Sequence, residues 1–268
     1  MRQKLKCLAG SVLHHLIPPL AREVDQGNTN DPHGRLKQLI ADYQISRAAA
    51  SGNASSLRRN LTHYWKSARG DGFYDAYPER FEEWFLGHHY SVVEALAREL
   101  EKRPEIHRLI EVGCGDGKVL QHLSDRFSTI DAAIGIDLNH HIVERNREVY
   151  RGTNLRFECT DLHLYLKNYQ GSGILLVSNG GVFEYLTQTE LEDLFTSFKN
   201  LASPVMLMLV EPIAADFDLK TETTSRPHGI EKSFSHPHRY LLEKSGWKVN
   251  FEEVQDLEHR WMLMVASA

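Results

Sequence analysis

Residues 108–117, Arg-Leu-Ile-Glu-Val-Gly-Cys-Gly-Asp-Gly, decide the fold of this chain. The apolar run that ends at Val112 predicts a buried strand, and a helix is expected to begin directly afterwards at Lys118. Glycines at this turn let the backbone approach a ligand closely, because a side chain would occupy the ligand's volume. The N–H groups that open the following helix favour a carboxylate or a phosphate. The segment therefore predicts a strand–turn–helix unit that binds a ligand.

The same alternation of short apolar runs and helical segments continues towards the C-terminus. This pattern is typical of a parallel sheet that is buried on both faces. Further strands are expected at residues 132–137, 154–159, 173–178 and 205–211, with helices at 118–127, 140–150, 162–169 and 189–201. A polar loop should run to about residue 234, before a helix at 237–245 and two antiparallel strands at 247–254 and 260–266. The fold class is α/β, with a seven-stranded, mostly parallel sheet and an antiparallel strand at its edge.

The first hundred residues lack the short apolar runs of the later part and contain no pattern typical of a strand. Helices are expected over residues 1–24, 35–50, 57–68 and 78–102, and prolines end the first of them. A linker is expected at residues 26–34 and a turn at 69–72. We expect a helical N-terminal extension at residues 1–104 and a ligand-binding domain at 105–268. The aromatic residues from Phe73 to Tyr77 continue in Phe81, Trp84 and Phe85. Either this stretch forms a lid in which Tyr74 or Tyr77 touches the ligand, or its helical spacing from Phe81 onward only packs one helix face on the sheet.

Composition limits the classes of partner. The chain has 268 residues, 41% of them hydrophobic, and a net charge of -5, so no global basic field favours nucleic acid. Residues 5–21 are too short and too polar to span a bilayer, so no membrane partner is expected, and a signal peptide is the weaker interpretation of this segment. Three cysteines without metal-ligand spacing predict no metal site and a reducing, cytoplasmic location. The apolar residues of the N-terminal helices need a partner surface, which indicates a possible homodimer.

The spacing of the glycines separates two cofactor classes. A dinucleotide fingerprint requires a third glycine where this chain has Lys118, which argues against a nicotinamide cofactor. Glu111 lies two positions before Gly113, and the glycines then recur at alternate positions. This pattern resembles motif I of the class I S-adenosylmethionine-dependent methyltransferases. The resemblance covers residues 105–268, implies a Rossmann-like fold, and gives S-adenosylmethionine as cofactor and S-adenosylhomocysteine as product.

The resemblance also implies which residues bind the cofactor. Glu111 would lie near its amino group, Asp137 would accept hydrogen bonds from the ribose hydroxyls, and Asp161 would lie beside the adenine. In this family, helical additions such as residues 1–104 often cap the cofactor. The complete set of implied cofactor-binding residues is Glu111, Gly113, Cys114, Gly115, Gly117, Asp137, Leu138, Asp161, Leu162, Asn179 and Gly180.

Transfer of a methyl group to a hydroxyl requires alignment of the acceptor and removal of its proton. The candidates for a general base are His88, His89, His236, His238 and Glu184, with Glu211 as a further alternative. Each of them has a competing structural explanation, since most of the 15 histidines will be surface or core residues.

These features together predict a methyltransferase that acts on a small molecule, with the hydroxyl of a natural product or a sugar as first choice. N- or C-methylation remains open, as does a non-catalytic protein that only binds the cofactor. The sequence Ser178-Asn-Gly-Gly181 differs from the (D/N)-P-P-(Y/F) loop of amino-methylating DNA enzymes, which argues against a DNA base as acceptor.

Overall fold

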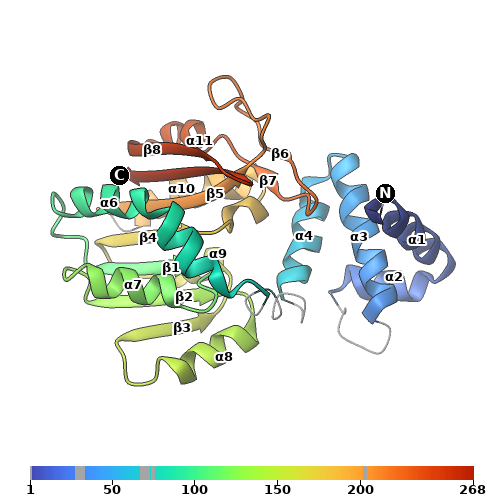
Figure 1. Cartoon of the computed structure of the whole chain (residues 1–268), viewed down its shortest axis with the longest axis horizontal. Helices are drawn as coiled ribbons and strands as arrows, with labels where there is room; N and C mark the ends of the chain where they lie inside the picture. Colours follow the sequence, from blue (N-terminus) through green and yellow to red (C-terminus); the bar gives the residue numbers. More distant parts are fainter. Residues whose placement is uncertain (1, 28–33, 67–72, 74–75, 202–203) are drawn as a thin grey trace.

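Figure 1 shows the computed structural model of the chain, which describes residues 2–27, 34–66, 73, 76–201 and 204–268. A twisted sheet with helices on both faces forms the larger part of the molecule. The helices α1 (Arg2–Leu16), α2 (Pro18–Asp25), α3 (Gly34–Ala50) and α4 (Ala54–Trp65) stand beside this sheet. Within the described residues, no helix is long and apolar enough to cross a membrane.

The sheet has seven strands in the order β3-β2-β1-β4-β5-β9-β8. The pairs among β1 to β5 are parallel, whereas β9 runs antiparallel between β5 and β8. The strands are β1 (Arg108–Val112), β2 (Ala132–Asp137), β3 (Leu155–Cys159), β4 (Ile174–Asn179), β5 (Val205–Ile213), β8 (Lys248–Asp256) and β9 (Arg260–Ser267). The predicted α/β fold with a seven-stranded, mostly parallel sheet is confirmed.

Both faces of the sheet are buried, because successive side chains of a strand point to opposite faces. Leu109 of β1 belongs to the apolar cluster under α6 (Tyr90–Leu100), α7 (Lys118–Arg126) and α8 (His140–Val149). Its neighbour Ile110 belongs to the cluster under α9 (Leu162–Asn168), α10 (Gln188–Leu201) and α11 (His238–Lys244). Only the ends of the strands are therefore left to build a site. The expected boundary at residues 104 and 105 falls just before β1, yet α6 on its N-terminal side packs on the sheet.

The N-terminal segment differs in detail from the expectation. The prolines end α1, but Pro18 also begins α2, where its missing N–H costs no hydrogen bond. α4 begins earlier than expected, at Ala54, because the Asn53 side chain accepts a hydrogen bond from the Ser56 N–H at 3.0 Å. Residues 67 and 68 of the expected helix and the turn at 69–72 lie outside the described residues.

The single helix expected over residues 78–102 is wrong. The chain instead forms a 3-10 turn, η1 (Pro78–Arg80), then a wider π-type helix, η2 (Phe81–His88), and then α6. The His89 N–H donates to the carbonyl of Trp84, five residues earlier, at 2.9 Å. Such a wide turn carries an extra residue that the spacing of apolar side chains does not reveal.

The polar loop after β5 contains a two-stranded ribbon that the sequence did not predict. β6 (Arg226–Pro227) pairs with β7 (Phe234–Ser235). Phe234 packs with Leu57 and Leu61 of α4, and Tyr185 of the short 3-10 turn η3 (Phe183–Tyr185) joins the same cluster. This cluster attaches the N-terminal helices to the edge of the sheet where β4 and β5 end.

Candidate active site

The loop after β1 meets the loop after β4 at Gly113. This residue has a φ of 64°, which an L-residue rarely adopts, and a Cβ added to it would lie 2.5 Å from a methyl carbon of Val182. The glycine therefore allows the two strand-end loops to touch at the floor of a pocket.

Asp137, the last residue of β2, has both carboxylate oxygens held by the backbone. Its Oδ2 accepts from the Gly115 N–H at 3.1 Å, and its Oδ1 accepts from the Asn139 N–H at 2.8 Å. Each oxygen keeps a lone pair for a further donor, such as a hydroxyl of a ligand. Burial raises the pKa of this carboxyl, while the backbone hydrogen bonds oppose that shift.

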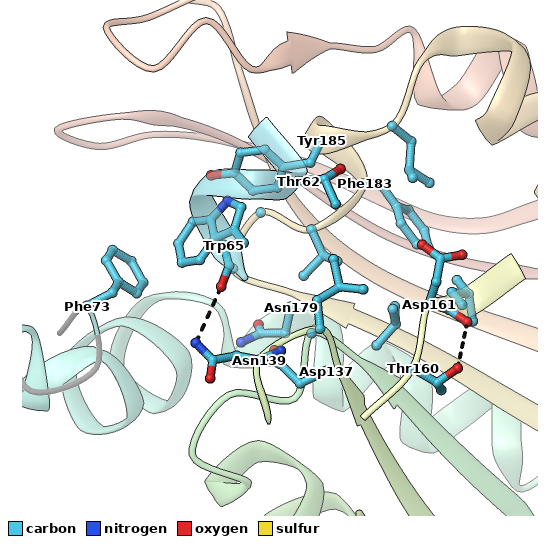
Figure 2. A pocket seen from close by; sticks show the side chains of 18 of the residues that line it. Thr62, Trp65, Phe73, Asp137, Asn139, Thr160, Asp161, Asn179, Phe183 and Tyr185 are labelled. Atoms are coloured by element: carbon cyan, nitrogen blue, oxygen red, sulfur yellow. Dashed lines mark hydrogen bonds between the residues drawn. The ribbon is translucent and has the colours of Figure 1, made fainter. Parts of the chain in front are cut away.

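Asp161 connects the end of β3 with the N-terminal helices. Its Oδ1 accepts from the His163 N–H at 2.9 Å and caps α9, while its Oδ2 lies 3.5 Å from the guanidinium of Arg58 on α4. Arg58 is also 3.3 Å from the carboxylate of Glu190. A second link lies nearby, since the Asn139 side chain donates to the Trp65 carbonyl at 3.3 Å. These contacts attach α4 across the ends of β2 and β3, and Figure 2 shows the one between Trp65 and Asn139.

The turn after β4 is organised by one buried carboxylate, Glu211 of β5. Its Oε1 accepts from the hydroxyl of Ser178 and from the N–H groups of Val182 and Phe183 at 3.2 and 3.1 Å. Its Oε2 accepts from the Glu184 N–H at 3.2 Å. Burial raises the pKa of Glu211 to about 7. With its acceptors occupied by the turn, Glu211 positions this loop and does not line the pocket.

These loops surround one pocket, and Figure 2 shows its side chains. It contains about 900 Å³ of empty space, a volume that includes space open to solvent. The strand ends contribute polar residues, glycines and two leucines, namely Gly113, Asp137, Leu138, Asn139, Thr160, Asp161, Leu162, Asn179, Gly180 and Gly181. The buried Oδ1 of Asn179 has no hydrogen-bond partner among the described residues, so a ligand could provide one.

Aromatic side chains and one arginine form the opposite side of the pocket. The Trp65 ring lies 5.2 Å from that of Phe73 and 5.4 Å from that of Tyr185, in edge-on contacts. The Arg80 guanidinium lies 4.6 Å from the centre of the Phe73 ring and 2.6 Å from where a Cβ on Gly180 would stand. Sequence reasoning missed Trp65, Tyr185, Arg58 and Arg80. It did single out the aromatic stretch that holds Phe73, whereas Tyr77 is exposed and Tyr74 lies outside the described residues.

Four of the predicted cofactor residues do not line the pocket: Glu111, Cys114, Gly115 and Gly117. They lie in the loop behind it, where the Gly115 N–H supports Asp137. Glu111 is buried under this loop, and its Oε2 has no partner among the residues that the structure describes. Burial and the nearby Asp116 raise its pKa well above the ordinary value.

None of the four predicted histidines is among the described residues that line the pocket. His88 is exposed on the surface, and His89 is buried against the Trp261 ring, where burial lowers its pKa to about 4. His236 is held between the Ser225 hydroxyl and the Phe183 carbonyl, at 2.6 and 3.1 Å, and its pKa is also lowered to about 4 by burial. His238 is buried behind it, with a pKa well below the ordinary value.

Glu184 also lies behind the pocket wall. Its carboxylate is 3.7 Å from the imidazole of His228, and it would collide with any side chain at Gly181. Burial raises its pKa to about 8, so the carboxyl keeps its proton at neutral pH. None of the predicted bases is therefore among the described residues that line the pocket.

Comparison with known proteins agrees with this geometry. Residues 109–204 match a family model described as a methyltransferase domain. No curated protein matches the chain. The magnesium protoporphyrin IX methyltransferase ChlM of Synechocystis PCC 6803, solved with bound S-adenosylhomocysteine, has a TM-score of 0.55 at 14% identity, over 78% of this chain and 98% of its own. A methyltransferase from Clostridium acetobutylicum has a TM-score of 0.52 at 10% identity, over 72% of this chain and 98% of its own.

The sheet, the strand-end pocket and the family match define a class I, Rossmann-like methyltransferase domain. Residues 109–204 belong to a methyltransferase domain, and S-adenosylmethionine is the cofactor that a domain of this class uses.

Proposed function

We propose that the chain methylates a small molecule on an oxygen atom, and that the acceptor is a planar, apolar compound whose reacting oxygen is acidic. The observation that supports this proposal is the pairing, in one pocket, of polar strand ends with a wall of aromatic rings and the Arg80 guanidinium. Methylation of nitrogen or carbon in the same pocket is the alternative, and so is a protein that binds the cofactor without turnover.

The strand ends fit the cofactor in their chemistry. We assign the ribose hydroxyls to Asp137, whose oxygens are oriented by two backbone N–H groups. Asp161 and Leu162 would flank the adenine, and the unpartnered Oδ1 of Asn179 would accept from the ammonium of the methionine part. Glu111, Cys114, Gly115 and Gly117 would act by shaping the loop behind the pocket.

The acceptor would lie between this cofactor site and the aromatic wall. Trp65 and Tyr185 offer faces and edges to a planar ring, and Figure 2 shows them across the pocket from Asp137 and Asn179. The Arg80 guanidinium, close to Gly180, would favour an oxygen that carries negative charge, as in a phenolate or a carboxylate. In the transfer the oxygen forms a bond to the methyl carbon, while the electron pair of the broken carbon–sulfur bond stays on sulfur.

This acceptor chemistry explains how transfer can proceed without an imidazole in the pocket. An acidic hydroxyl or carboxyl loses its proton to water before it binds, so alignment and exclusion of water are the main tasks left to the protein. His88, His89, His236 and His238 would not act as bases, because they are either exposed elsewhere or buried and neutral. Glu184 would position Gly181.

The N-terminal residues would complete the site as a cap. We propose that residues 1–104 provide the acceptor side of the pocket and that residues 105–268 form the cofactor domain, with α4 held over the strand ends by the Arg58–Asp161 ion pair. Cysteines 7, 114 and 159 are free thiols, which supports a cytoplasmic location. The net charge of -5 argues against nucleic acid as a partner.

Ligand-dependent unfolding tests the cofactor site first. A ligand at about a hundredfold its dissociation constant should add about 2.7 kcal/mol to the free energy of unfolding. We expect an upward shift in melting temperature with S-adenosylmethionine and S-adenosylhomocysteine, none with NAD, and none in Asp137→Ala. If the two adenosyl ligands fail to stabilise the wild type, the assignment of the pocket is wrong.

Turnover and acceptor class are tested separately. The purified protein is incubated with S-adenosylmethionine and a panel of phenols, aromatic carboxylic acids, sugars and aromatic amines, and mass spectrometry detects the methylated product together with S-adenosylhomocysteine. Arg80→Gln should raise KM for anionic acceptors, whereas Arg126→Gln, which breaks an ion pair with Glu94 outside the pocket, should not. Methylation of amines alone would refute the oxygen acceptor, and cofactor binding without product would favour the binding-only alternative.

A further inference from the structure

Helix α1 has an apolar side that nothing in the described part of the chain covers. Leu5, Leu8, Val12 and Leu16 have exposed fractions between 49% and 74%. They recur every three or four residues, so they form one stripe along the helix, the outer stripe. Large apolar side chains grouped in this way mark a surface that binds something.

The opposite side of α1 is fixed to α3, which determines the direction of the outer stripe. Gly10 is buried, and a Cβ there would collide with the Leu39 carbonyl, so the two helices are in close contact. The Cys7 sulfur lies 3.2 Å from the Ser46 hydroxyl. In Figure 1, α1 stands at the end of the molecule away from the sheet. A flat surface could therefore approach the stripe without covering the active site.

The charge of this segment is opposite to that of the whole chain. Residues 1–22 contain Arg2, Lys4, Lys6 and Arg22 and no acidic residue, although the chain carries a net charge of -5. Lys6 is exposed, and it follows Leu5 on the flank of the outer stripe. A helix with an apolar stripe and basic neighbours matches the interface of an anionic bilayer, which offers both apolar depth and negative charge. A second copy of α1 would instead bring like charges together.

We propose that the outer stripe of α1 binds the surface of an anionic lipid bilayer, with the helix lying in the plane of the interface. This proposal departs from the expectation of no membrane partner, which rested on the lack of a segment long and apolar enough to span a bilayer. It does not depend on the identity of the methyl acceptor.

Sedimentation with lipid vesicles tests the proposal on the full chain. Vesicles of phosphatidylcholine are compared with vesicles that also contain phosphatidylglycerol, and we expect binding to the second kind that weakens as salt is added. The double substitution Leu8→Gln and Leu16→Gln should weaken that binding by at least about tenfold, because two large apolar side chains are no longer buried. Lys6→Gln should weaken it by about fivefold and only on anionic vesicles.

Two controls keep the result interpretable. Ile230→Gln removes an apolar side chain that is 78% exposed elsewhere and should bind vesicles as the wild type does. The melting temperature and its shift with S-adenosylhomocysteine report whether the variants are folded. The proposal is overturned if the wild type does not bind anionic vesicles, or if the double variant binds as well as Ile230→Gln. Light scattering that shows a dimer in the wild type and a monomer in the double variant would assign the stripe to a second copy and would equally overturn it.

Discussion

Glu211 allows a quantitative test of how the loop after β4 is held. Its carboxyl is fully buried, and burial raises its pKa from 4.5 to about 7. In the unfolded chain the carboxyl loses its proton as the pH rises above 4.5, its ordinary pKa. In the folded protein it keeps its proton up to about pH 7. The folded state therefore binds more protons in this window, so its stability must fall as the pH rises.

The magnitude follows from the two pKa values. At 1.36 kcal/mol for each pKa unit, Glu211 should lower the free energy of unfolding by about 2 kcal/mol between about pH 5.5 and about pH 8. Glu211→Gln cannot ionise and should lack this component. The variant keeps one oxygen for Ser178, Val182 and Phe183, but its amide nitrogen faces the Glu184 N–H, which should cost about 1–3 kcal/mol at the lower pH.

Urea unfolding of both proteins at the two pH values measures this difference. We expect the wild type to be clearly more stable than Glu211→Gln at the lower pH and the gap to shrink by about 2 kcal/mol at the higher pH. Glu101→Gln serves as the control, because it removes an exposed carboxyl and leaves this turn untouched. An equal gap at both pH values would show that Glu211 is ionised throughout, and the reasoning from burial would be refuted.

Three further predictions concern other parts of the site and its support. Gly113→Ala should cost about 1–2 kcal/mol, because the residue has a φ of 64°, and should abolish the thermal shift with S-adenosylhomocysteine; a normal shift would contradict the role of this turn. Asn139→Ala should lower stability to urea by about 0.5–2 kcal/mol through loss of the α8 cap, whereas Asn139→Ser, which can still cap, should retain most of it. His89 should lower the free energy of unfolding of the wild type by up to about 3 kcal/mol as the pH falls from 6.5 towards 4, because the unfolded chain binds a proton that the folded state excludes. His89→Phe should lack this component in urea unfolding, and an unchanged pH dependence would disprove the prediction.

Local sequence was sufficient for the elements that build the cofactor side. The strands from Arg108 to Ile213 were predicted within two residues at each end, because buried parallel strands are short apolar runs bounded by glycine and polar residues. Asp137, Asp161 and Asn179 line one pocket because the carboxyl ends of neighbouring parallel strands meet at one edge.

The catalytic candidates could not be judged in the same way. His89 and His236 belong to segments that looked suitable for covering the site, but Trp261 and Phe183, distant in sequence, bury them. Residue type and position along the chain carry no information on such burial, which depends on packing between segments.

By itself the sequence determined the α/β class, the succession of the seven main-sheet strands along the chain with the helices between them, and the edge of the sheet where the ligand-binding loops meet, because these depend on local periodicity and on glycine. Tertiary structure alone decided which side chains face the pocket. Trp65 and Arg80 reach it only because α4 and η1 pack against the ends of β2, β3 and β4. It also decided which face of α1 is left exposed, since Gly10 turns one side toward α3 and leaves Leu8 and Leu16 on the other. Contacts between residues far apart in the chain fix these orientations, and no pattern within a single segment encodes them.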